Sequence, residues 1–145
     1  MNQGVISYQR NNLKTEYFMK ITALDHLVLT VNDMDKSIDF YVNVLGMTEV
    51  TFGDNRKAVQ FGNQKINLHQ KGKEILPNSN NATCGSADLC LLTDAPLERV
   101  MEHLMACGVA IVDGIVPRTG AVGAIDSVYV RDPDGNLLEI SCYAD

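Results

Sequence analysis

Hydrophobic and polar positions recur along this chain with two spacings, one typical of β-strands and one typical of α-helices. A segment with strand spacing is followed by a segment with helical spacing, and this order occurs twice. The segment Leu24–Val31 is rich in Leu, Val and Thr, as is typical of a β-strand. The next segment starts with the helix N-cap signal Asn32-Asp33, carries apolar residues at helical spacing and stops at Gly46. The pattern therefore predicts a strand followed by a helix.

The second half of the chain repeats this order. Ala87–Leu92 has the composition of a strand, and an apolar stripe at helical spacing follows it and stops at Gly108. His26 precedes Gly46 by 20 residues, and Asp88 precedes Gly108 by the same 20. Equal spacing between a polar residue of the strand and the glycine that stops the helix predicts a duplicated unit.

Three more strand candidates follow each predicted helix, so each unit is expected to be a βαβββ module. Modules 21–70 and 86–143 would be joined by a linker, 71–85, that is rich in Asn, Gly and Ser. Because one helix covers only one face of a sheet, the modules must pack together. We expect an α+β fold in which two mixed sheets form an incomplete barrel with a central cleft. The six strand candidates are Met47–Phe52, Lys57–Phe61, Lys65–Gln70, Val109–Val116, Ser127–Arg131 and Asn136–Tyr143.

Polar, ligand-capable residues interrupt several of these apolar strands. His26 lies in the first strand, Asn67 and His69 share one face of the fourth, and Asp88 lies in the fifth. Glu139 stands in the middle of the last strand, where an unpaired buried carboxylate would be costly. Imidazole and carboxylate ligands suit Zn, Ni, Mn, Co or Fe, and His26, His69 and Glu139 would form a two-His-one-carboxylate set.

Each candidate also has a purely structural interpretation. His26 could be a hydrogen-bonded, half-buried histidine, and His69 could be solvated near its strand end. Glu139 could pair with Arg131 or Arg118 at a surface edge. Asp88 could cap a backbone amide.

Composition and charge narrow the possible partners and location. The net charge is -6, which disfavours nucleic acid as a partner. No apolar run approaches the ~20 residues needed to cross a bilayer, so no membrane association is expected. Residues 1–20 lack a secretory signal pattern and are expected to form a flexible arm. The four cysteines form no CxxC pair and are expected to be reduced, mostly buried thiols, which suits a cytoplasmic protein.

Three segments resemble the vicinal oxygen chelate superfamily, which includes glyoxalase I, bleomycin-resistance proteins and extradiol dioxygenases. Asp25–Val31 is similar to its opening strand. Phe40-Tyr41 followed by Leu45–Met47 is similar to its helix end. Asp132–Asn136 with Leu138–Ile140 is similar to its closing motif. The resemblance covers residues 21–143 and is nearest to lactoylglutathione-lyase-like members, including some labelled virulence proteins.

The resemblance implies a set of site residues. Metal ligands in the superfamily come from the first, fourth, fifth and eighth strands, which here carry His26, Asn67, Asp88 and Glu139. Asn67 and Asp88 depart from the usual residue types, and His69 is a possible replacement on the fourth strand. A divalent-metal enzyme of the glyoxalase I type is implied, acting on a small carbonyl substrate or on its glutathione conjugate. Glu139 or Asp88 would move a proton between adjacent carbons.

Other residues would contact the substrate. Arg118, in the glycine-rich segment 117–123, is the candidate clamp for an anionic group, although it could equally be a solvated surface arginine. Asn67 and Tyr129 are further candidates for substrate contact. The alternatives are an antibiotic- or toxin-binding resistance protein, a thiol transferase acting on an epoxide, and an extradiol-type dioxygenase. A homodimer is expected, with modules paired either within one chain or between chains.

Overall fold

The structure, a computed structural model, describes residues 18–144, so most of the expected arm lies outside the described residues. Eight strands and three helical segments follow one another in the predicted order. They are β1 (His26–Val31), α1 (Met34–Asp39), the π-helical η1 (Phe40–Val44), β2 (Thr48–Phe52), β3 (Arg56–Phe61), β4 (Gln64–Gln70), β5 (Asp88–Leu92), α2 (Leu97–Ala106), β6 (Asp113–Thr119), β7 (Ala124–Arg131) and β8 (Leu137–Tyr143).

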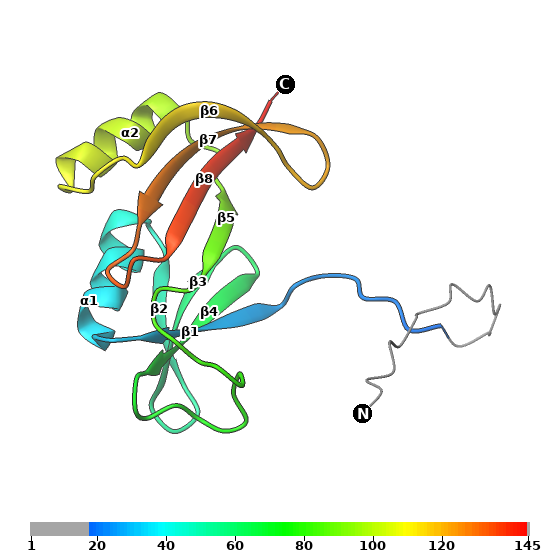
Figure 1. Ribbon diagram of the computed structural model, residues 1–145, viewed down its shortest axis with the longest axis vertical. Helices are drawn as coiled ribbons and strands as arrows, with labels where there is room; N and C mark the ends of the chain where they lie inside the picture. The colour runs from blue at the N-terminus through cyan, green and yellow to red at the C-terminus, as the bar shows by residue number, and fades with distance from the viewer. Residues whose placement is uncertain (1–17, 145) are drawn as a thin grey trace, which may run out of the picture.

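The strands form two four-stranded mixed sheets with the same topology. The first has the order β1-β4-β3-β2 and the second β5-β8-β7-β6. The first strand of each module pairs in parallel with the last, and the other pairs are antiparallel. Figure 1 shows each sheet with its own helical segment. The predicted α+β architecture of two βαβββ modules is therefore confirmed.

Equivalent residues occupy equivalent places in the two modules. Gly46 and Gly108 follow the helical segments and both have a φ of 75°. Glycine adopts this left-handed conformation without the steric cost that a Cβ atom would bring. His26 is the first residue of β1, and Asp88 is the first residue of β5. The duplicated spacing in the sequence thus corresponds to a duplicated structure.

One face of each sheet packs into a shared core with the helices. Fully buried residues from both modules meet there, among them Tyr41, Leu104 and Leu138. The opposite face of each sheet carries the alternate residues, and we call it the helix-free face. On the first sheet it includes His26, and on the second it includes Glu139.

The two sheets meet through the helical layer and a turn, and they do not close on each other. Within residues 18–144, no strand of one sheet is paired with a strand of the other. Figure 1 shows the β7–β8 turn lying against α1. There, the side-chain nitrogen of Asn32 donates to Asp134 at 2.8 Å. On the helix-free face, Val28 in the middle of β1 remains 43% exposed.

Some strand boundaries differ from the sequence-based expectation: β6 begins at Asp113 and not at Val109, and β7 begins at Ala124 and not at Ser127. Residues 117–119 belong to β6, whereas the sequence indicated a loop from 117 onward. β6 is the edge strand of its sheet, and an edge strand tolerates a residue that cannot donate a backbone hydrogen bond. Pro117, which has no N–H group, is therefore compatible with this strand. Arg118 therefore lies on a strand, and its position in a glycine-rich loop was predicted wrongly. Among the described helices, none is long and apolar enough to span a membrane.

Candidate functional site

His26 is held by its neighbour in the chain. Its Nδ1 atom lies 2.8 Å from Oδ2 of Asp25, and its side chain is 43% exposed. A carboxylate bonded to one ring nitrogen fixes the ring and leaves the other nitrogen available as a ligand. This is the environment that many metal-binding histidines have in proteins.

Asn67 and His69 stand on the same helix-free face, in the interior of β4. They are only 4% and 6% exposed. Oδ1 of Asn67 and both ring nitrogens of His69 have no hydrogen-bond partner in the described part of the chain. Burial, followed by the nearby Arg56 guanidinium, lowers the pKa of His69. Buried polar atoms without partners are costly, which is a common mark of a binding site.

The register between β1 and β4 separates the two predicted histidine ligands. His26 is aligned with Lys65, whereas His69 is aligned with Thr30, four residues further along the strand. At about 3.3 Å per residue this offset is about 13 Å, and side chains on a sheet stand roughly perpendicular to it. Asn67 lies only two residues beyond Lys65. The register favours Asn67 as the neighbour of His26, and the ligand role of His69 stays a prediction.

Glu139 lies at the head of a polar network on the helix-free face of the second sheet. Oγ of Ser127 donates to Oε2 of Glu139 at 2.6 Å and lies 2.7 Å from Oγ of Ser141. Sγ of Cys90 lies 3.3 Å from the same Ser141 oxygen. Across the described residues, Glu139 forms no ion pair with any arginine or lysine. The hydrogen bond from Ser127 orients the Glu139 carboxylate, and no arginine or lysine of the described residues balances its charge.

Asp88 and Glu139 repeat the arrangement of His26 and Asn67. Asp88 is aligned with Leu137, so Glu139 lies two residues further along β8. The four expected ligand positions thus form two equivalent pairs, one on each sheet. In the portion of one chain that the structure describes, no three His, Cys, Asp or Glu side chains gather closely enough to hold an ion. One chain therefore brings together pairs of candidates and not the whole set.

Arg118 and Tyr129 contact each other on the second sheet. Nε of Arg118 donates to the Tyr129 hydroxyl at 3.0 Å, and its guanidinium carbon lies 5.4 Å from the ring centre. A second guanidinium nitrogen lies 3.7 Å from Oδ2 of Asp113. Part of the Arg118 charge is therefore already balanced, and its role as an anion clamp stays a prediction.

A cationic group on the first sheet was not anticipated from the sequence. Nζ of Lys65 lies 3.6 Å from the centre of the Phe52 ring, and the guanidinium carbon of Arg56 lies 4.8 Å from the same centre. The three residues come from three adjacent strands. Strand alternation alone could have suggested a shared face. The register aligns Lys65 with Gln60, four residues from Arg56, so the groups meet only because the long Lys65 side chain reaches the Phe52 ring.

The cysteines are free, as expected, but Cys84 and Cys142 are only half-buried and the other two are exposed. All four described cysteines are unpaired, and Cys90 and Cys107 are exposed. Cys90 lies on the helix-free face of β5, which is an edge strand of its sheet. Their apolar sequence surroundings made burial the expectation, and that expectation was wrong for these two.

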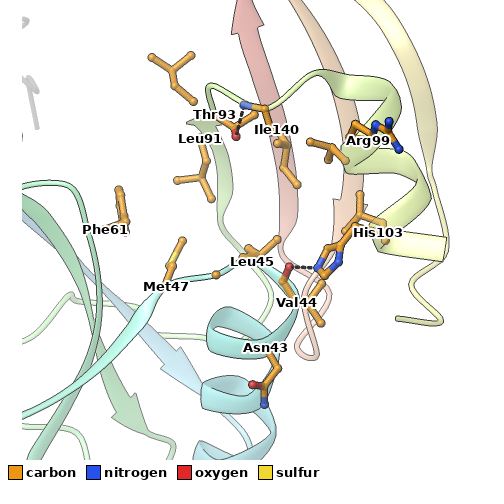
Figure 2. A pocket seen from close by; sticks show the side chains of 15 residues that line it. Asn43, Val44, Leu45, Met47, Phe61, Leu91, Thr93, Arg99, His103 and Ile140 are labelled. Carbon is orange, nitrogen blue, oxygen red and sulfur yellow. Dashed lines mark hydrogen bonds between the residues drawn. The ribbon is translucent and has the colours of Figure 1, made fainter. Parts of the chain in front are cut away.

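A cavity of about 400 Å³ lies between the modules on the helical side. Figure 2 shows Met47 and Phe61 on one wall, with Leu91 and Ile140 on the other. Nε2 of His103 lies 2.7 Å from the carbonyl oxygen of Val44 at its edge. None of the predicted site residues lines this cavity, because they lie on the opposite, helix-free faces of the two sheets.

Comparison with known proteins identifies the family. Residues 23–140 match the model of the Glyoxalase/Bleomycin resistance protein/Dioxygenase superfamily. The chain belongs to this superfamily. It is 54% identical over 125 residues to virulence protein STM3117 of Salmonella typhimurium, covering 86% of this chain and 87% of that protein. The crystal structure of STM3117 superposes with a TM-score of 0.86, over 87% of this chain and all of that one.

Other members are related at different distances. Glyoxalase domain-containing protein RDO1 of Mycosarcoma maydis is 50% identical over 142 residues, which is 98% of this chain and 78% of that protein. Metallothiol transferase FosB of Shouchella clausii is 24% identical over 83% of this chain and 80% of its own length. A lactoylglutathione lyase from Agrobacterium tumefaciens shares the fold, with a TM-score of 0.67 and 21% identity over 86% of this chain and 96% of that one.

Proposed function

We propose that this chain is a divalent-metal-dependent enzyme of the glyoxalase I type. The observation that carries the proposal is the pair of equivalent positions described above. His26 and Asn67 stand on one sheet, and Asp88 and Glu139 stand at the matching places on the other. His26 and Glu139 would hold the metal, and Asn67 and Asp88 would complete or border its shell.

The residues present fit a divalent ion of the Zn, Ni, Mn, Co or Fe group, which accept mixed nitrogen and oxygen ligands. Asp25 holds Nδ1 of His26, and Ser127 holds one oxygen of Glu139. Each candidate ligand therefore keeps another atom for an ion. Oδ1 of Asn67 has no partner within residues 18–144, as expected for a group that awaits a ligand.

A second copy of the chain would complete the site. Within residues 18–144, the candidate ligands of one chain do not gather in one place, and Val28, on the same face as His26, is 43% exposed. If the first sheet of one chain faces the second sheet of another, His26 and Asn67 would meet Asp88 and Glu139. A homodimer with modules exchanged between chains is therefore part of the proposal.

In the proposed reaction the chain supplies orientation and proton transfer. When bound, the metal would act as a Lewis acid on two adjacent oxygens of a small carbonyl substrate. A carboxylate of Glu139 or Asp88 would move a proton between the adjacent carbons, as a positioned general base and acid. The Ser127 hydroxyl keeps Glu139 in one orientation. Tyr129 and Arg118 would border the substrate on the second sheet.

The distant relatives support enzymatic chemistry on this fold without selecting one reaction. One is named a lactoylglutathione lyase and another a metallothiol transferase. The superfamily also includes bleomycin resistance proteins, so binding a small molecule without turnover is the second candidate. The unneutralised Glu139 and the anchored His26 favour the metal enzyme. A cytoplasmic location stays a prediction.

Elemental analysis of the native full-length protein tests the proposal. We expect close to one divalent metal ion per chain, and loss of most of it in His26→Ala and in Glu139→Ala. His103→Ala is the matched control, because His103 bonds a backbone carbonyl on the helical side. Isomerisation of the hemithioacetal of methylglyoxal and glutathione should be lost with the metal. Full metal content in both variants would overturn the proposed site.

A further inference from the structure

We infer that Arg56 and Lys65 form an oxyanion subsite on the helix-free face of the first sheet, and that the substrate is an anionic small molecule. This inference rests on the proposed function, because the subsite would hold one end of the substrate while the metal position holds the other. The group recognised is a carboxylate or a phosphate.

The geometry brings two cations onto one aromatic ring. Phe52 is aligned with Arg56 across the β2–β3 pair, and Lys65 reaches the same ring from β4. Nζ of Lys65 and the guanidinium carbon of Arg56 both lie within 5 Å of the ring centre, at 3.6 and 4.8 Å. Contact with the ring holds both charged groups in place on the helix-free face, where each keeps N–H groups for a further partner.

The charges of these two side chains are not balanced by the protein. Among the residues that the structure describes, neither Arg56 nor Lys65 forms an ion pair with a carboxylate. The adjacent Lys57, which points to the other face, is paired with Glu49 at 3.3 Å. The net charge of the chain is -6, so a pair of neighbouring unbalanced cations is not a consequence of a basic composition. A bound anion would relieve their repulsion.

Buried polar groups beside the cations point to the same ligand. Lys57 is aligned with Leu68, so Arg56 lies opposite His69 on the helix-free face. The ring nitrogens of His69 and Oδ1 of Asn67 lack partners in the described residues, and both side chains are more than nine-tenths buried. An oxyanion held by Arg56 and Lys65 could accept a further hydrogen bond from the ring N–H of His69.

Binding measurements on the metal-free, full-length protein test this inference. The probes are inorganic phosphate and pyruvate, with methyl pyruvate as the uncharged match for pyruvate. We expect the charged probes to bind at millimolar concentration or below, and methyl pyruvate to bind at least tenfold more weakly than pyruvate. In the double variant Arg56→Gln/Lys65→Gln, the affinity for the charged probes should fall at least tenfold. Preference for phosphate or for pyruvate identifies the group.

Two controls separate this result from loss of the fold. Lys57→Gln removes the same charge from the neighbouring position on the opposite face and should leave the affinity unchanged. Nuclear magnetic resonance of the wild-type protein provides a readout without any substitution. The imidazole signals of His69 should shift on addition of phosphate, and those of His103 should not.

The outcomes distinguish this inference from the proposed function. Unchanged affinity in the double variant, equal binding of methyl pyruvate, or no binding of either charged probe to the wild type would overturn the subsite. Such a result would leave the metal content of the protein untouched. A different outcome is that the native protein holds no metal and still binds anions through Arg56 and Lys65. That result would support the subsite and overturn the proposed metal-dependent enzyme.

Discussion

The phenolic hydroxyl of Tyr41 donates a 2.6 Å hydrogen bond to the carboxylate of Asp132, 91 residues further along the chain. Asp132 also accepts hydrogen bonds from the backbone N–H groups of Asp134 and Asn136. Tyr41 belongs to the helical segment of the first module, and Asp132 opens the turn between β7 and β8. The family motifs Phe40-Tyr41 and Asp132–Asn136 therefore contact each other where the two modules join. In this contact their role is structural.

Tyr41→Phe should lower the free energy of unfolding by about 1–3 kcal/mol. The substitution removes a buried hydrogen-bond donor, so Oδ2 of Asp132 loses one of its hydrogen bonds. Burial, followed by the charge of Asp132, raises the pKa of Tyr41, so the hydroxyl stays a donor throughout the physiological range. Urea denaturation followed by circular dichroism measures the change. Tyr143→Phe, at a more exposed hydroxyl, should change stability by less than about 0.5 kcal/mol. Equal losses in the two variants would contradict this role of Tyr41.

Asp25→Asn should weaken metal binding by about 10–100-fold, as is usual when the carboxylate that orients a histidine ligand is removed. The Asp25 carboxylate lies 2.8 Å from Nδ1 of His26 and holds the ring in place. Competition with a chromogenic chelator measures the affinity. Asp54→Asn, in the turn between β2 and β3, is the control for the loss of one negative charge. An Asp25→Asn protein with wild-type affinity would show that His26 needs no such support.

Metal loading should protect Cys90 from thiol reagents. Cys90 is aligned with Glu139 across the β5–β8 pair, so its exposed thiol stands beside the proposed ligand. Cys107 is also exposed, but it caps α2 on the helical side and should react at the same rate with or without metal. Labelling with an Ellman-type reagent, compared between wild type and Cys90→Ser, measures the two rates. Protection of both thiols, or of neither, would argue against a metal at Glu139.

Stability should fall on acidification because of His69. Its pKa in the folded protein is lowered from 6.5, first by burial and then by Arg56, with Glu74 acting weakly in the opposite direction. As pH drops through about 6.5 the unfolded chain binds the proton first, so the free energy of unfolding decreases. It decreases by at most about 1.4 kcal/mol per pH unit until the folded pKa is also passed.

Denaturation midpoints of metal-free protein between pH 7.5 and pH 5, compared with those of His69→Gln, measure this dependence. The variant should lose less stability than the wild type over the same range. His103→Gln, at the edge of the inter-module cavity, is the matched control for the loss of an imidazole. If the wild type and His69→Gln show the same pH dependence, His69 is not held neutral by the fold.

Much of the local structure and part of the candidate site could be predicted from residue order. The alternation within a strand is a local property, so it placed His26, Asn67 and Glu139 on identifiable faces before any contact was known. The glycine that ends each helix depends only on the neighbouring backbone, which is why Gly46 and Gly108 marked the duplicated module.

Relationships across the chain were decided by the tertiary structure. The register of β4 against β1 set Asn67, and not His69, beside His26, because a one-residue slip of a strand changes every partner without changing the strand's own pattern. The meeting of Arg56 with Lys65 on the Phe52 ring likewise depends on three strands at once. Local periodicity is encoded in consecutive residues, whereas the pairing of distant strands depends on the packing of the whole molecule.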